Sequence, residues 1–254
     1  MSLYNRIDSV MLERLLPDGG VQAGIYAQAF RISDACCMFA FLFSNLLLPM
    51  FSRMIKQREN VSRLVRIATV MMMVPVLAGA GMCVFYRKPI MDLLYYCHVE
   101  ESSPIFAFLI VGFIFISLTY IYGTLLTANG SLRKLNLIAF GGMVFNIVLN
   151  LILIPRYQAF GAAIVSLVTQ SLTAIIQIIV AFSIFGLKFK GQTQFMLIIY
   201  VIGIVALGFI TTHLPFEWLI NAIMMLLLSL TLAFALKLIT INDFVMILKK
   251  KNEN

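Results

Sequence analysis

The sequence predicts an all-α, polytopic membrane protein, and three observations lead to this fold class. Of its 254 residues, 61% are hydrophobic and 12% are charged, whereas a soluble domain is about 45–50% apolar and about 25% charged. The apolar runs are about 18–28 residues long, which suits helices that cross a ~30 Å hydrocarbon core. They do not alternate polar and apolar residues, as the strands of a membrane barrel do.

Eight apolar segments follow one another, separated by short polar connectors. The first, 2–16, is too short and too polar to span a membrane alone, and we expect it to be the second half of a helix. Seven full spans are predicted at 23–51, 67–86, 104–128, 137–154, 160–185, 195–212 and 217–239. Two connectors are amphipathic: 52–66 is expected to lie flat on the membrane surface, and 86–103 to form a similar element on the other side, with Leu93, Leu94, Tyr95 and Tyr96 facing lipid.

The basic residues predict which way the chain is inserted. Thirteen of the nineteen Lys and Arg residues fall in the C-terminal tail and in connectors on the same side, while only Arg87, Lys88 and Arg156 fall on the other side. The positive-inside rule therefore places the basic side and the C-terminus in the cytoplasm. The net charge of +8 is then explained by topology and by attraction to anionic lipid headgroups, and nucleic acid is not an expected partner.

Charged residues inside two neighbouring apolar segments are the strongest functional signal. Arg6 and Asp8 lie in the first segment, and Arg31 and Asp34 lie one helical turn apart in the second. A charge at the bilayer centre costs about 2.5–3.5 kcal/mol on insertion scales, so such residues usually face a bundle interior or a watery cavity. We expect a cationic cavity for an anionic headgroup, because the arginine fork donates two hydrogen bonds to a phosphate. The alternatives are salt bridges that only hold helices together and an Arg31 that reaches the membrane interface.

Amides and hydroxyls also interrupt the later segments. Those considered are Asn45, Asn146, Asn150, Thr169, Gln170, Thr173 and Gln177. Asn146 and Asn150 are four residues apart and so share a helix face. Such groups either join helices by hydrogen bonds or contact a substrate.

Catalytic and metal-binding patterns are absent from the sequence. Its two histidines, His98 and His213, fall in connectors, and it contains neither a glycine-rich phosphate loop nor a serine elbow. The four cysteines have no CxxC spacing, so neither a metal cluster nor a disulfide framework is expected. We expect a protein that is not an enzyme and needs no cofactor.

Four stretches occur in an order that resembles a known family. They are "LYNRIDSVML", "GIYAQAFRISDA", "LLPMFSRM" and "LLTANGSLRKLNLIAFGGMVFNIVLNLILIPRYQAFGAAIVSLVTQ". Together they resemble the C-terminal half of polysaccharide flippases of the multidrug/oligosaccharidyl-lipid/polysaccharide (MOP) superfamily, which share the fold of multidrug and toxin exporters (MATE). The resemblance implies that 1–185 is the C-terminal transport lobe and that 186–254 holds two additional helices and a basic tail.

The resemblance also implies a function. Family members carry polyprenyl-pyrophosphate-linked oligosaccharides across the bacterial cytoplasmic (inner) membrane for O-antigen, lipopolysaccharide or capsule biosynthesis. The implied partners are this lipid-linked oligosaccharide and membrane lipids. The N-terminal lobe of the family has no match in the sequence, and the alternatives are a truncated gene product, a mispredicted start, a separate chain that supplies this lobe, or a second copy of the chain. The alternatives are a truncated remnant or scaffold that does not transport, and a MATE-like small-molecule exporter with an acidic cavity.

Site residues follow from the same resemblance. It implies that Arg6 and Arg31 contact the pyrophosphate headgroup, and that Asp8 and Asp34 form ion pairs with them or bind a coupling cation. The candidate polar lining of the cavity is Asn5, Asn146, Asn150, Gln170 and Gln177.

Overall fold

Every regular element that the structure contains is an α-helix. The structure is a computed structural model that describes residues 7–187 and 191–238, without the side chains of 191 and 192. Its helices are α1 (Ile7–Leu15), α2 (Gly19–Lys56), α3 (Ser62–Phe85), α4 (Arg87–Leu94), α5 (Val99–Ala128), α6 (Leu132–Phe185), α7 (Gly191–Thr212) and α8 (Trp218–Ala235). Six of them, α2, α3, α5, α6, α7 and α8, are long and apolar enough to cross a membrane. The chain is therefore an all-α, multi-pass membrane protein, as its composition predicts.

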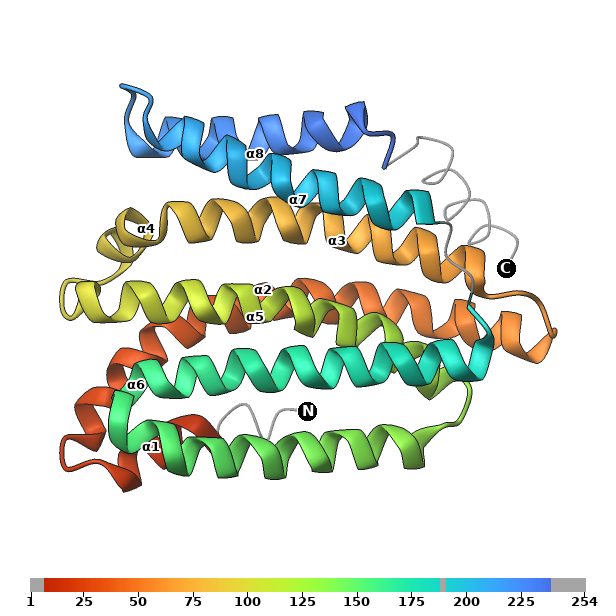
Figure 1. Cartoon of the computed structure of the whole chain (residues 1–254), viewed down its shortest axis with the longest axis horizontal. Helices are drawn as coiled ribbons and strands as arrows, with labels where there is room; N and C mark the ends of the chain where they lie inside the picture. Colours follow the sequence, from red (N-terminus) through yellow and green to blue (C-terminus); the bar gives the residue numbers. More distant parts are fainter. Residues whose placement is uncertain (1–6, 188–190, 239–254) are drawn as a thin grey trace.

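The long helices lie side by side, and their ends gather at the two ends of the bundle (Figure 1). The α2–α3 and α5–α6 connections, the last turn of α6 and the first turn of α7 lie at one end, on the right of the view. We call this the basic end, because the connectors there include Arg58 and the adjoining helix turns carry Arg53, Lys56, Arg63, Arg66, Arg133 and Lys134. Helix α4 and the α7–α8 connection lie at the opposite end.

The two connectors predicted to be amphipathic surface elements have different outcomes. The prediction for 52–66 is wrong, because its first residues continue α2 to Lys56 and its last residues belong to α3 from Ser62. Only 57–61 separates the two helices, and the side-chain oxygen of Asn60 accepts a hydrogen bond from the Ser62 amide at 2.9 Å. An element in 86–103 is present as α4, and its last two residues, Leu93 and Leu94, are 68% and 53% exposed.

Helix α6 is two helices joined at a single residue. It contains 54 residues, but Gln158 has φ 53° and ψ −136°, far from helical values. A straight helix of this length would be about 80 Å long at 1.5 Å per residue, well beyond the membrane core. The chain instead reverses at the joint, and the two halves lie side by side (Figure 1). The spans predicted at 137–154 and 160–185 correspond to these halves.

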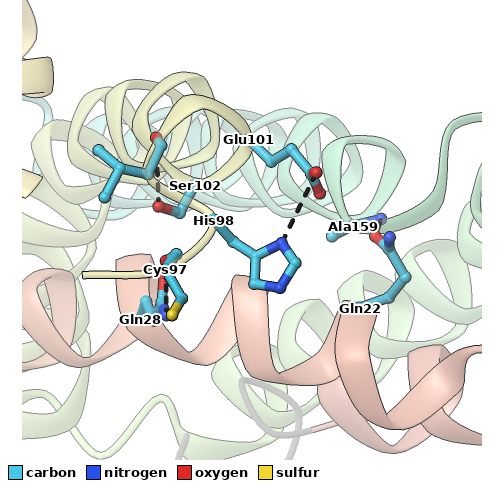
Figure 2. Close-up of polar contacts among 8 residues, drawn as sticks. Gln22, Gln28, Cys97, His98, Glu101, Ser102 and Ala159 are labelled. Atoms are coloured by element: carbon cyan, nitrogen blue, oxygen red, sulfur yellow. Dashed lines mark hydrogen bonds and ion pairs between the residues drawn. The ribbon is translucent and has the colours of Figure 1, made fainter. Parts of the chain in front are cut away.

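Local chemistry explains why the reversal occurs there. Pro155 lacks an amide hydrogen and crowds the preceding turn, which weakens the helix before the joint. At Gly161, an added Cβ would lie 2.6 Å from the carbonyl oxygen of Leu153, so only glycine lets the halves approach this closely. The amide of Ala159, at the start of the second half, donates to the side-chain oxygen of Gln22 on α2 at 3.2 Å (Figure 2). Such amides have no partner within their own helix, so Gln22 caps the second half.

The short segment 95–98, between α4 and α5, crosses α2 near the joint of α6 (Figure 2). The side-chain amide of Gln28 donates to the carbonyl oxygen of Cys97 at 3.3 Å, and the Tyr95 hydroxyl donates to the carbonyl oxygen of Gln28 at 3.2 Å. Tyr95 therefore packs against α2 instead of facing lipid as expected. His98 follows, and its backbone has the left-handed conformation. Its Nδ1 atom lies 3.7 Å from the Oε1 atom of Glu101.

Helix α5 forms the centre of the bundle, and α7 and α8 form a layer on one side of it. In α5, 61% of the spanning window is buried, the largest share among the six candidate spans. Helices α7 and α8 pack against α3, where the Tyr200 hydroxyl donates to the carbonyl oxygen of Val74 at 3.2 Å. Tyr200, Val74 and Met225 belong to one buried apolar cluster. The two last helices are thus anchored to the rest through α3.

Candidate functional site

A buried polar cluster joins α1, α2 and the first half of α6. One carboxylate oxygen of Asp8 accepts a hydrogen bond from the Asn150 side-chain amide at 2.7 Å, and the other accepts from the Tyr26 hydroxyl at 3.0 Å. The same Asn150 nitrogen donates to the side-chain oxygen of Asn146 at 3.0 Å. All four side chains are at most 2% exposed. We call these four residues the Asp8 cluster.

The Asp8 cluster is rich in oxygen and poor in positive charge. Within the part of the chain that the structure describes, Asp8 has hydrogen-bond donors but no Lys, Arg or His in a salt bridge with it. The side-chain oxygen of Asn150 is also buried and lacks a partner there. An uncompensated carboxylate is costly in a membrane bundle and usually marks a proton or ion site. Carboxylate and amide oxygens suit a hard cation, and the carboxylate also suits a proton.

A second feature is an exposed polar stripe on α2. Arg31, Asp34 and Asn45 are exposed and lie within about 60° of one another around the helix at 100° per residue. The apolar residues Met38 and Leu42 lie on the same face between Asp34 and Asn45. Among the described residues, Arg31 and Asp34 form no ion pair with each other or with a third residue. The stripe therefore presents charge on a face that the other described helices leave open.

The exposed faces of the other outer helices are different. In the middle of the first half of α6, the exposed residues are Leu137, Ala139, Phe140, Gly141, Val144, Val148, Leu151 and Ile152. Along α7 from Phe195 to Ile210, every exposed residue is likewise apolar. These faces suit lipid tails, whereas the α2 stripe with its arginine and aspartate does not.

The structure brings some of the predicted site residues together and separates others. Asn146 and Asn150 meet Asp8, but Asp34 lies two helical turns beyond Tyr26 on α2. Asp34 instead lines a small pocket with Gln170 of α6 and Leu109 of α5. Gln177 points toward α5, since an added Cβ at Gly123 would lie 3.3 Å from its side-chain oxygen. Asn5 and Arg6 lie outside the described residues.

Sequence reasoning missed two partners that the structure supplies. Tyr26 holds Asp8, and Gln22 caps the second half of α6. Both lie at the start of the second apolar segment, eighteen and fourteen residues after Asp8. The available signal was their polarity beside an apolar run, together with the pairing of Asn146 and Asn150 on one face of a later helix.

Across residues 7–187 and 191–238, no three His, Cys, Asp or Glu side chains gather as potential metal ligands. His98 and Glu101 form one exposed pair at the end of the bundle opposite the basic end (Figure 2). No protein-family model matches the chain, and no curated protein matches it.

Proposed function

We propose that this chain is the C-terminal lobe of a flippase that carries a polyprenyl-pyrophosphate-linked oligosaccharide across the bacterial cytoplasmic membrane. The observation that carries the proposal is the α2 stripe, in which Arg31, Asp34 and Asn45 are exposed on a membrane-spanning helix. Exposed polar faces at this depth belong against water or another protein surface. A transport cavity between this lobe and an N-terminal lobe provides both.

The chemistry of the stripe suits a pyrophosphate headgroup. Arginine is always charged and donates two parallel hydrogen bonds to phosphate oxygens, which lysine does not. Because Arg31 is exposed and forms no ion pair among the described residues, its guanidinium is available to a ligand. Asp34, one turn away, repels the anion, and this weakens the binding enough for the anion to be released.

The Asp8 cluster serves in this proposal as the site of the coupling ion. It joins α1, α2 and α6 through hydrogen bonds from Tyr26 and Asn150, so an ion bound there acts on the relative position of three helices. Counted with α6 as two spans, the described part of the chain crosses the membrane seven times after α1. The basic end then faces the cytoplasm under the positive-inside rule, and the C-terminus lies on that side.

The test replaces Arg31 in the source cell, with the gene at its own locus. Arg31→Ala is expected to lower export of the surface polysaccharide at least tenfold, because a hydrogen bond to a charged group contributes about 1.5–3 kcal/mol. Arg31→Lys keeps the charge but loses the fork and should recover only part of the export. Arg63→Ala is the control, since Arg63 is exposed on α3 outside the stripe. Normal export by Arg31→Ala at normal protein level would remove the proposal's main support.

The Asp8 cluster also favours a second candidate, a MATE-like exporter of small cations. A buried carboxylate without a basic partner among the described residues is the kind of group that binds a cationic drug or the ion exchanged for it. Cells that express the chain then tolerate higher concentrations of cationic drugs, and Asp8→Asn abolishes that tolerance. Unchanged drug tolerance together with an export defect in Arg31→Ala separates the flippase from this exporter.

A further inference from the structure

A groove at the basic end lies between α3, α5, α6 and α7, away from the Asp8 cluster and the α2 stripe. Its volume is about 190 Å³. Its lining includes Arg66, Val70, Ile178, Gln194 and Leu197. A drug-sized ligand usually needs a pocket of about 300–1,000 Å³. The groove therefore suits part of a larger molecule whose remainder lies in the membrane.

Arg66 gives the groove its charge. It is half-buried in the wall, and within the described part of the chain no carboxylate forms a salt bridge with it. A half-buried guanidinium beside an apolar wall at a basic helix end is well placed to pair with an anionic headgroup. The groove has no acidic residue among its described lining, so the described part of the chain offers Arg66 no counter-anion there.

On α3 and α7, the lining changes from polar to apolar in the direction of the membrane. At 1.5 Å per residue, Arg66 lies about 6 Å from the start of α3, and Gln194 about 4.5 Å from the start of α7. Both helices start at the basic end (Figure 1). Val70 and Leu197 lie one turn deeper on the same two helices, about 9–12 Å from those starts. The groove thus has a cationic mouth at headgroup level and an apolar interior beneath it.

We propose that this groove binds one anionic phospholipid of the leaflet at the basic end. Its phosphate pairs with Arg66 and accepts a hydrogen bond from the Gln194 amide, while the first part of one acyl chain lies along Val70, Ile178 and Leu197. Basic pockets between membrane helices recognise anionic headgroups through this combination of charge and apolar wall. The lipid bridges α7 to α3, α5 and α6, and so strengthens the attachment of the last two helices.

The experiment measures retained lipid by native mass spectrometry on the full 254-residue chain. The chain is purified in micelles that contain equal amounts of phosphatidylglycerol and phosphatidylcholine. The wild type is expected to keep phosphatidylglycerol in preference, and Arg66→Gln to reduce that preference about tenfold. Arg63→Gln is the matched control, because it removes an exposed arginine from the same end of the same helix without touching the groove. Equal retention of both lipids by the wild type, or an unchanged preference in Arg66→Gln, would overturn the proposal.

Two further arms keep the outcome decisive. If Arg66→Gln does not fold, Leu197→Trp fills the apolar part of the groove and leaves Arg66 in place, and it should also lose the bound lipid. Retention of phosphatidylglycerol by Leu197→Trp would contradict the position proposed for the acyl chain. Glycerol 3-phosphate serves as a soluble headgroup probe in lipid-free detergent. If it raises the melting temperature as much as phosphatidylglycerol does, the groove is a phosphate site and not a lipid site.

Discussion

Gly142 lies where the two halves of α6 are in close contact, and it offers the sharpest test of the joined-helix arrangement. It is buried in the first half of α6, and an added Cβ would lie 2.6 Å from the methyl carbon of Thr173 in the second half. Carbon atoms in good contact are about 3.5–4.0 Å apart. Gly142→Ala therefore forces the two halves apart by about 1 Å or makes Thr173 change its rotamer.

Both responses have a cost that can be worked out. The Thr173 hydroxyl lies 2.9 Å from the carbonyl oxygen of Thr169 and 3.0 Å from that of Gln170. Turning the side chain loses this bonding, which is worth about 0.5–1.5 kcal/mol. Separating the helices instead has the usual overpacking cost of about 1–3 kcal/mol. The gain in helix propensity from glycine to alanine is about 1 kcal/mol and offsets part of the loss.

The neighbouring glycine removes the propensity term from the comparison. An added Cβ at Gly141 would meet nothing within 4 Å, so Gly141→Ala should gain stability from propensity alone. We expect Gly142→Ala to be less stable than Gly141→Ala by about 1–3 kcal/mol. The measurement is the free energy of unfolding in mixed dodecylmaltoside and sodium dodecyl sulfate micelles, followed by circular dichroism.

A double variant tests the named contact directly. Thr173→Ser removes the methyl group and keeps the hydroxyl, so it should restore most of the stability that Gly142→Ala loses. If the two alanine variants unfold at the same free energy, the halves of α6 are not packed at Gly142. If Thr173→Ser does not rescue Gly142→Ala, the cost arises from a contact other than the methyl group.

Three other predictions concern polar contacts. Gln22→Ala should lower the free energy of unfolding by about 1–3 kcal/mol, because it leaves the buried Ala159 amide without an acceptor. Gln22→Glu keeps an acceptor and should keep most of the stability. Equal unfolding free energies for the two variants would refute this cap. Asp8→Asn preserves the shape of the side chain and should keep the unfolding free energy within about 1 kcal/mol of the wild type. It should also abolish ion-coupled transport in vesicles. Unimpaired coupling would exclude Asp8 as the ion site. The hydrogen bond with Glu100, and then the charge of that carboxylate, raise the pKa of Lys88 above its usual value. This contribution is complete below the unfolded-state pKa and is lost only as the pH rises through the folded-state pKa, so a titration of the melting temperature between pH 6 and pH 9 should show no step that Lys88→Gln removes.

Much of the fold could be predicted from the sequence, because apolar length is a strong signal in a membrane protein. Each predicted full span corresponds to a helix or to one half of α6. The errors lie at the helix ends, where 52–66 extends α2 and α3 instead of forming its own helix. The amphipathic pattern of that stretch is shared by a surface helix and by helix ends that leave the membrane, so pattern alone does not separate them.

The site could be predicted only in part. The shared face of Asn146 and Asn150 follows from their spacing, but their contact with Asp8 joins residues more than 130 positions apart. Such a contact depends on how α1 packs against α6, which local sequence does not determine. Likewise, the spacing of Arg31 and Asp34 is compatible with an ion pair. The two side chains are nevertheless exposed and form no ion pair among the described residues.

The one-residue joint in α6 couples the tilt of its first half to the tilt of its second half. A median connection of four to six residues absorbs small rotations of the helices it joins, whereas the joint at Gln158 has one non-helical residue and is clamped by Gln22. The first half of α6 contacts Asp8 through Asn150, and the second half packs beside α5 through Gln177. A tilt of one half is therefore passed to the other. In the proposed function, an ion bound at the Asp8 cluster would thus change how the second half packs against α5.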